Sequence, residues 1–244
     1  MHEIKMPQWA IDIALERRGK LHVHENLNPA KTALIVVDLQ NAFMVKEVAV
    51  AYVPVAAEIV LNVNRLAAAV RRTGGKVFWI KHSIDETSSI AWSEWLNMMT
   101  PSVREGIVKN LTPGSRGHAI YPTLEVKPED EVVQKYRFSA FVQGSSDLPR
   151  RLRAQGYDTV LITGTVTNVC CESSARDAMM LNFKTIMVSD ANAARTDAEH
   201  NATLATFYAI FGDVMDTALL IERLEANGAR GVAANSAPSA TLTV

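Results

Sequence analysis

Short apolar runs alternate with longer amphipathic segments along this chain, and this alternation constrains the fold more than any other feature. The first run, "TALIVV" at residues 32–37, is apolar throughout, which is typical of a strand buried on both faces of a sheet. Similar runs occupy residues 76–80, 130–134, 159–163 and 184–189, with a short sixth run near Val214. Segments of helical periodicity accompany them at residues 55–75, 145–156, 168–182, 197–212 and 216–228. The pattern predicts an α/β fold with three α/β/α layers and a mainly parallel central sheet of about six strands.

Three stretches lie outside this alternation. Residues 1–30 form an N-terminal extension in which we expect a short amphipathic helix over residues 7–18. Residues 83–125 form a long insertion after the second strand, and segments of this length are typically lids or subunit contacts. Residues 229–244 are small and polar, which predicts a flexible C-terminal tail or an arm onto a neighbour. The enzyme-sized domain therefore covers residues 31–228.

Composition excludes several classes of protein. A hydrophobic fraction of 48% supplies a large core, and a formal net charge of −1 gives no electrostatic reason to bind nucleic acid or an anionic membrane. No run approaches the roughly 18 apolar residues of a membrane span, and acidic residues interrupt the N-terminal apolar stretch, unlike a secretory signal. The two cysteines are adjacent, so no ordinary disulfide framework forms. These observations predict a cytoplasmic domain.

Polar residues follow three of the predicted strands. Asp38 follows "ALIVV", Lys135 follows "DEVVQ", and Cys170 lies at the expected first turn of the helix after "TVLIT". Ligands of open parallel sheets bind beyond the carboxyl ends of the strands, so we expect these three side chains to converge. Each alone has an ordinary explanation as a turn former, a solvated surface group or a small buried residue. Their coincidence favours a site.

The three residues form a chemically coherent set. A helix start and a nearby ammonium lower a thiol pKa, so Cys170 is the candidate nucleophile. Asp38 would take its proton and deliver it to a leaving amine, while Lys135 would stabilise negative charge. Cys171 lies about 100° further round the helix and is expected in the core.

Other motifs are missing from the sequence or have simpler explanations. Adjacent cysteines lack the spacing of a C-x-x-C redox or zinc motif, and "DLQN" after the first strand is neither a dinucleotide fingerprint nor a phosphate loop. His22 and His24 form an H-x-H pair in the N-terminal extension, where a surface accident outweighs a metal site.

The strings "ALIVVDLQNAF", "QKYRFSAF" and "ITGTVTNVCCESSARDA" occur in this order. Together they resemble the isochorismatase-like cysteine hydrolase superfamily over about residues 32–215, and in detail its ureidoacrylate amidohydrolase and N-carbamoylsarcosine amidase branches. The resemblance implies a Rossmann-like isochorismatase fold and a catalytic triad of Asp38, Lys135 and Cys170.

The same resemblance implies further features of the site. It implies an oxyanion hole from the backbone N–H groups of Val166 and Cys170, with a cis Thr165–Val166 peptide bond, and an aromatic pocket wall at Phe43. The Asp-x-His pattern of metal-dependent nicotinamidases is not matched by "KHSIDE", so we expect neither a metal nor another cofactor.

These features predict an amidohydrolase that cleaves a linear amide, ureido or carbamoyl C–N bond of a small molecule through a thioester, releasing ammonia or an amine. An isochorismatase-type vinyl-ether hydrolase, which works without the cysteine, and a non-catalytic binding protein are the alternatives. Beside Phe43, candidate substrate-binding residues are Asn41, Arg137 and Trp92; Arg137 could equally pair with a surface acid, and Trp92 could equally lie in the core or a subunit interface. We expect a homodimer or homotetramer.

Overall fold

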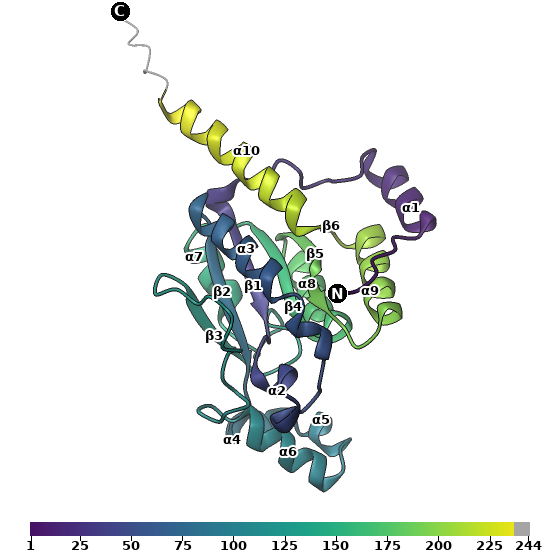
Figure 1. The fold of residues 1–244 in the computed structure, drawn as a ribbon, viewed down its shortest axis with the longest axis vertical. Coiled ribbons are helices and arrows are strands. Elements are labelled where there is room, and N and C mark those ends of the chain that lie inside the picture. Colours follow the sequence, from purple (N-terminus) through teal and green to yellow (C-terminus); the bar gives the residue numbers. More distant parts are fainter. Residues whose placement is uncertain (237–244) are drawn as a thin grey trace, which may run out of the picture.

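In a computed structural model, a single six-stranded sheet forms the centre of the molecule (Figure 1). The structure describes the backbone of residues 1–236 and the side chains of residues 1–228. All neighbouring strands are parallel, in the order β3-β2-β1-β4-β5-β6. The strands are β1 (Thr32–Val37), β2 (Lys76–His82), β3 (Glu131–Lys135), β4 (Thr159–Thr165), β5 (Lys184–Ala193) and β6 (Asp213–Met215). The predicted parallel α/β sheet of about six strands is confirmed.

Strand β1 shows why the sheet is buried on both faces. Every residue of β1 is buried, and its side chains alternate between two apolar clusters. Leu34 and Val36 join one cluster, whereas Ile35 and Val37 join the other. Each face of the sheet must therefore be covered by helices.

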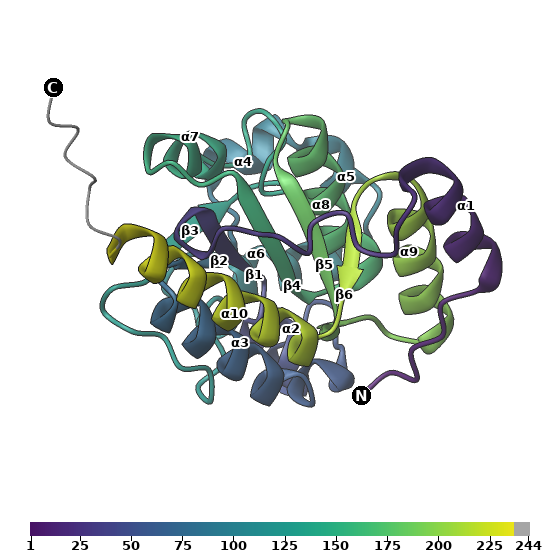
Figure 2. The same ribbon diagram turned by 90° about the horizontal axis from the view of Figure 1, so that it is seen from above.

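Helices cover the two faces as Figure 2 shows from above. One layer contains α3 (Val60–Arg72) and α10 (Thr217–Ser236), which pack against each other. The opposite layer contains α7 (Leu148–Ala154), α8 (Glu172–Met180) and α9 (Asp197–Ile210). Helix α10 was expected to end at Gly228 but continues to Ser236, so this part of the predicted tail is helical. The remainder of that tail, residues 237–244, lies outside the described residues.

The insertion after β2 is mostly helical. It contains α4 (Glu86–Ala91), α5 (Ser93–Asn97) and α6 (Pro101–Leu111), which lie with α2 (Asn41–Met44) at the carboxyl end of the sheet (Figure 1). Shorter helical turns are Pro29–Lys31, Lys46–Val48 and Pro54–Ala57, the last of which splits off the start of the helix expected over residues 55–75. Among residues 1–236, no helix is long and apolar enough to cross a membrane.

The N-terminal extension packs along the edge of the domain. Its helix α1 (Gln8–Arg18) confirms the expected short helix and lies against α9. The helix is not the amphipathic one expected, because it buries only Ala10 and Ala14 while Trp9 and Leu15 are exposed. The H-x-H pair is more than a surface accident: His22 Nδ1 lies 2.9 Å from Oδ1 of the buried Asp213, and the His24 backbone N–H donates to Asp213 Oδ2 at 3.1 Å. The pair thus attaches the extension to β6.

Candidate active site

The carboxyl ends of the strands bring Asp38, Lys135 and Cys170 together. Asp38 directly follows β1, Lys135 is the last residue of β3, and Cys170 lies in the turn after β4. Asp38 and Lys135 are fully buried and Cys170 is 3% exposed. Lys135 Nζ lies 2.8 Å from Asp38 Oδ2 and donates to the Arg137 carbonyl oxygen at 3.0 Å. Strands β2 and β3 are added on one side of β1, whereas β4, β5 and β6 are added on the other, so this cluster occupies the topological switch point, where α/β sheets bind ligands.

Two backbone features bring Asp38, at the end of β1, close to the end of β4. Asp38 has a φ of 53°, in the left-handed region that few residues other than glycine adopt, and its N–H donates to the Ile80 carbonyl at 3.0 Å. Gly164 has a φ of 119°, and a Cβ there would collide with the Val37 backbone. Only glycine allows this approach of β4 to β1.

The turn that carries Cys170 differs from the expected helix start. The Thr165–Val166 peptide bond is cis, as the family resemblance implies. A π-helical turn, η4 (Thr167–Cys171), follows and precedes α8, so the helix expected from residue 168 begins with a wider turn. Cys171 is fully buried against the sheet, with Sγ 3.9 Å from the Thr163 carbonyl oxygen. Its expected place in the core is confirmed.

The electrostatics correct the expectation of a lowered thiol pKa. Burial raises the pKa of Cys170, and the Lys135 ammonium offsets this only in part because Asp38 already balances its charge. Burial likewise raises the pKa of Asp38 above the usual carboxyl range. Burial acts to lower the pKa of Lys135, but the negative charge of Asp38 opposes it and the net pKa is raised. These pKa directions favour a protonated thiol, a carboxyl group more basic than an exposed aspartate and an ammonium that keeps its proton.

A cavity of about 340 Å³ opens beside Cys170. The insertion supplies one wall, and the segment after β5 supplies two charged groups, Arg195 and Glu199. The insertion thus covers the cavity of its own chain. The cavity-lining residues that come from the insertion at residues 83–125 are Trp95, Met99, Val103, Ile107 and Leu111.

His82 is a site residue that the sequence reasoning missed. It ends β2 directly opposite Lys135 in the strand register, lines the cavity and is 2% exposed. Its backbone N–H donates to Gln40 Oε1 at 2.7 Å, and Gln40 Nε2 donates back to the His82 carbonyl at 3.1 Å. The ring stacks on Trp95 at a centroid distance of 5.8 Å. Burial first, and then the Lys135 charge, lower the pKa of His82 well below its usual range, so the imidazole is neutral.

The predicted substrate-binding residues separate into two groups. Phe43 lines the cavity, as expected. Asn41, Arg137 and Trp92 are not among the lining residues. Asn41 Nδ2 donates to the Arg116 carbonyl, Arg137 donates to backbone carbonyls of Tyr136 and Ala91, and the Trp92 ring lies 5.4 Å from the Arg137 guanidinium carbon. These three positions are occupied by structural contacts around the cavity rather than in it.

Possible metal ligands occur in this cluster. One ligand atom each of Asp38, His82 and Cys170 lies within 4.8 Å of the others. However, the ammonium of Lys135 already contacts the Asp38 carboxylate, and a cation there would meet that positive charge. Asp85, the nearby carboxylate of "KHSIDE", caps α4 by accepting from the Ser88 N–H at 2.7 Å. The donor set therefore fits a bound metal poorly.

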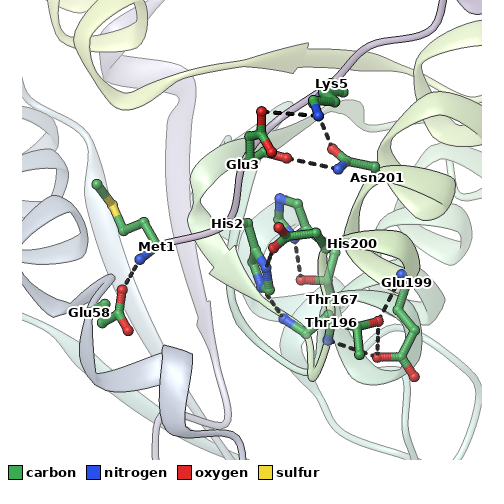
Figure 3. A network of polar contacts seen from close by, with 12 residues as sticks. Met1, His2, Glu3, Lys5, Glu58, Thr167, Thr196, Glu199, His200 and Asn201 are labelled. Atoms are coloured by element: carbon green, nitrogen blue, oxygen red, sulfur yellow. Dashed lines mark hydrogen bonds and ion pairs between the residues drawn. The ribbon is translucent and has the colours of Figure 1, made fainter.

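The N-terminal residues reach the turn that carries Cys170 (Figure 3). The ring of His2 stacks on that of His200 at 4.3 Å, and His200 Nδ1 lies 2.9 Å from Thr167 Oγ1 in η4. His200 Nε2 must donate to the Ser189 carbonyl at 3.0 Å, so Nδ1 of the neutral ring accepts the Thr167 hydroxyl proton. Burial lowers the pKa of His200 to about 4, which keeps this arrangement at neutral pH.

The fold and its buried thiol, carboxylate and ammonium define a doubly wound α/β protein with a site at the switch point. Residues 32–218 match the isochorismatase domain model. The chain belongs to the isochorismatase family of hydrolases.

Similar proteins have named activities. The ureidoacrylate amidohydrolase RutB of Methylobacterium radiotolerans is 33% identical over 205 residues, which are 79% of this chain and 79% of the relative. A cysteine hydrolase from Pseudomonas syringae pv. phaseolicola has a similar structure, with a TM-score of 0.74 at 31% identity, covering 83% of this chain and 96% of that one. N-carbamoylsarcosine amidase from Thermoplasma acidophilum has a TM-score of 0.61 at 26% identity, covering 77% and 96% of the two chains.

Proposed function

We propose that the chain is a cysteine-dependent amidohydrolase that cleaves a linear amide, ureido or carbamoyl C–N bond of a small molecule. The observation that carries this proposal is the contact of Lys135 with Asp38 next to Cys170 at the base of a cavity. Similar proteins are an amidohydrolase and an amidase, which supports the same type of bond.

In the proposed reaction, Cys170 Sγ bonds to the substrate carbonyl carbon as its proton passes to Asp38. The carboxylate suits this task because its raised pKa makes it a better proton acceptor than an exposed aspartate. Asp38 then protonates the departing nitrogen while the C–N bond breaks, leaving a thioester. Water then attacks the thioester carbonyl carbon while Asp38 takes a proton from it. The sulfur regains that proton from Asp38 as the C–S bond breaks.

Negative charge develops on the carbonyl oxygen in both steps. We assign its stabilisation to the backbone N–H groups of Val166 and Cys170, next to the Thr165–Val166 bond. Lys135 keeps Asp38 ionised and contributes positive charge at the same site.

An ammonia-release screen over amides, ureas and carbamoyl compounds tests this function. We expect turnover that disappears in Cys170→Ala at unchanged fold. Hydrolysis of an isochorismate-type vinyl ether by Cys170→Ala, without ammonia release from any amide, would instead identify the enzyme as a vinyl-ether hydrolase.

The proposed setting is a cytoplasmic homodimer or homotetramer that acts on a small molecule without nucleic acid or membrane. The two most exposed large apolar side chains of the described residues, Ile90 at 74% and Met98 at 75%, lie on the insertion and support an interface there. Light scattering at micromolar concentration measures the mass. A fully active monomer would refute this assembly.

A further inference from the structure

The cavity beside Cys170 has an apolar body. Phe43 and the insertion residues Met99, Ile107 and Leu111 contribute to its wall. Glu199 at the cavity is held by Thr196, whose N–H and hydroxyl both donate to Glu199 Oε2 at 3.0 Å. Arg195 is exposed to solvent. A small polar or acidic substrate would leave most of this apolar wall uncovered.

Two polar atoms interrupt the apolar lining near the sulfur. His82 Nε2 and Asn168 Oδ1 are buried, and neither has a hydrogen-bond partner among the residues that the structure describes. Both residues line the cavity that Cys170 also lines. Buried polar atoms are nearly always paired, so these two atoms are free to form hydrogen bonds with a ligand that enters the cavity.

The chemistry of these atoms specifies the ligand group. Asn168 Oδ1 can only accept, so its partner carries an N–H or O–H donor. The neutral imidazole of His82 can accept or donate at Nε2 according to its tautomer. A terminal –CO–NH2 group supplies two N–H donors on one nitrogen, and that nitrogen is bonded to the carbonyl carbon that Cys170 would attack.

We propose that the substrate is a primary amide or ureido compound, –CO–NH2, whose substituent is apolar and either aromatic or branched aliphatic. His82 and Asn168 bind the –CO–NH2 end, and the wall formed by Phe43, Met99, Ile107 and Leu111 binds the substituent. This inference rests on the proposed function and deepens it, because it separates the residues that recognise the reacting group from those that recognise the substituent.

A matched pair of substrates tests the apolar part. Phenylacetamide and 3-phenylpropanamide are compared with malonamate and succinamate, which carry a carboxylate in place of the ring, by ammonia release. We expect kcat/KM for the phenyl compounds to exceed that for the acids by about 100-fold or more. Equal or better turnover of the acids, still dependent on Cys170, would overturn this inference alone. Absence of ammonia release from every amide and ureido compound would overturn the proposed function as well.

Variants test the assignment of residues. Ile107→Phe fills the apolar wall, so it lowers the ratio of kcat/KM for phenylacetamide to that for acetamide. Lys109→Ala, on the exposed side of α6, is the matched control and keeps the wild-type ratio. Asn168→Leu and His82→Phe remove the polar atoms and raise KM about tenfold or more for both substrates. Unchanged KM in both variants, with the wild-type circular dichroism spectrum, would contradict their role.

Discussion

Lys135 Nζ lies 2.8 Å from Asp38 Oδ2 with both side chains fully buried. Removing one partner leaves an uncompensated buried charge, which typically costs about 3–5 kcal/mol. We therefore expect Lys135→Met to lower the free energy of unfolding by that amount, and the double variant with Asp38→Asn to recover part of the loss. Urea denaturation of the four proteins of this double-mutant cycle measures the coupling. An additive result would show that the contact contributes nothing.

Substitutions at the two adjacent cysteines should have different effects, because Cys170 is proposed to react with substrate and Cys171 packs in the core. Cys170→Ser should abolish ammonia release, whereas Cys171→Ala should retain most of it, because Cys171 is fully buried against the sheet. The cavity left by the missing sulfur should lower the free energy of unfolding by about 1 kcal/mol. Steady-state kinetics and thermal unfolding of both variants check this. Comparable loss of turnover in both folded proteins would remove Cys170 from its assigned role.

The raised pKa values predict the pH dependence. Only ionised Asp38 can take the thiol proton, so kcat/KM should fall as the pH drops through the raised pKa of Asp38, above the range of an exposed carboxyl group. The raised pKa of Lys135 keeps the ammonium charged at alkaline pH. A pH profile of kcat/KM checks this, and an acid limb in the ordinary carboxyl range would contradict it.

Alkylation tests the neutral thiol directly. Burial raises the pKa of Cys170, so iodoacetamide at pH 7 should modify it more slowly than free glutathione. Cys170 should still react before Cys171 because it lines the cavity. Peptide mass spectrometry over time measures both rates. Immediate labelling of Cys170 would indicate a thiolate in the resting protein.

Hydrolysis should survive exhaustive dialysis against EDTA or a stronger chelator, because the Lys135 ammonium opposes a cation at Asp38. Metal content by plasma mass spectrometry and residual activity are measured on the same sample. Activity that is lost and then restored by zinc or iron would make Asp38, His82 and Cys170 a metal site.

The stack of His2 on His200 predicts that His2, outside the cavity, affects the rate of the reaction at Cys170. His2→Ala should lower kcat by up to about tenfold, because it loosens His200, whose Nδ1 accepts the hydrogen bond from the Thr167 hydroxyl in the turn that carries Cys170. His2 Nε2 also accepts from the Ala194 N–H at 2.9 Å, and its Nδ1 lies 2.7 Å from Asp197 Oδ1. His2→Gln should restore part of kcat, since its amide can accept the first of these hydrogen bonds and donate the second. Lys5→Ala, whose side chain is 70% exposed, is the control. Equal kinetics in all three variants would limit His2 to a structural contact.

The strand-end residues were predictable from sequence, whereas the cavity wall was not. Apolar runs define the strands and parallel strands end at one edge, so Asp38, Lys135 and Cys170 follow from position alone. The same rule identifies His82, the last residue of β2, once that strand end is included. Sequence position alone does not show where the side chains of Asn41, Arg137 and Trp92 point. Hydrogen bonds to backbone carbonyls orient Asn41 and Arg137, and stacking on the Trp95 ring orients Trp92. Such contacts depend on tertiary packing that no local pattern encodes.

Asp38, Lys135 and Cys170 are placed by strands, whereas much of the apolar cavity wall belongs to the insertion at residues 83–125. Register between β1 and β4, fixed where Gly164 meets Val37, does not depend on what that insertion contains. The sheet that carries the three site residues and the insertion that forms the cavity wall can therefore change in sequence independently of each other. A chimera that carries a relative's insertion on this sheet should keep the reaction and acquire the donor's substrate preference, which makes this segment the natural unit of exchange for changing specificity.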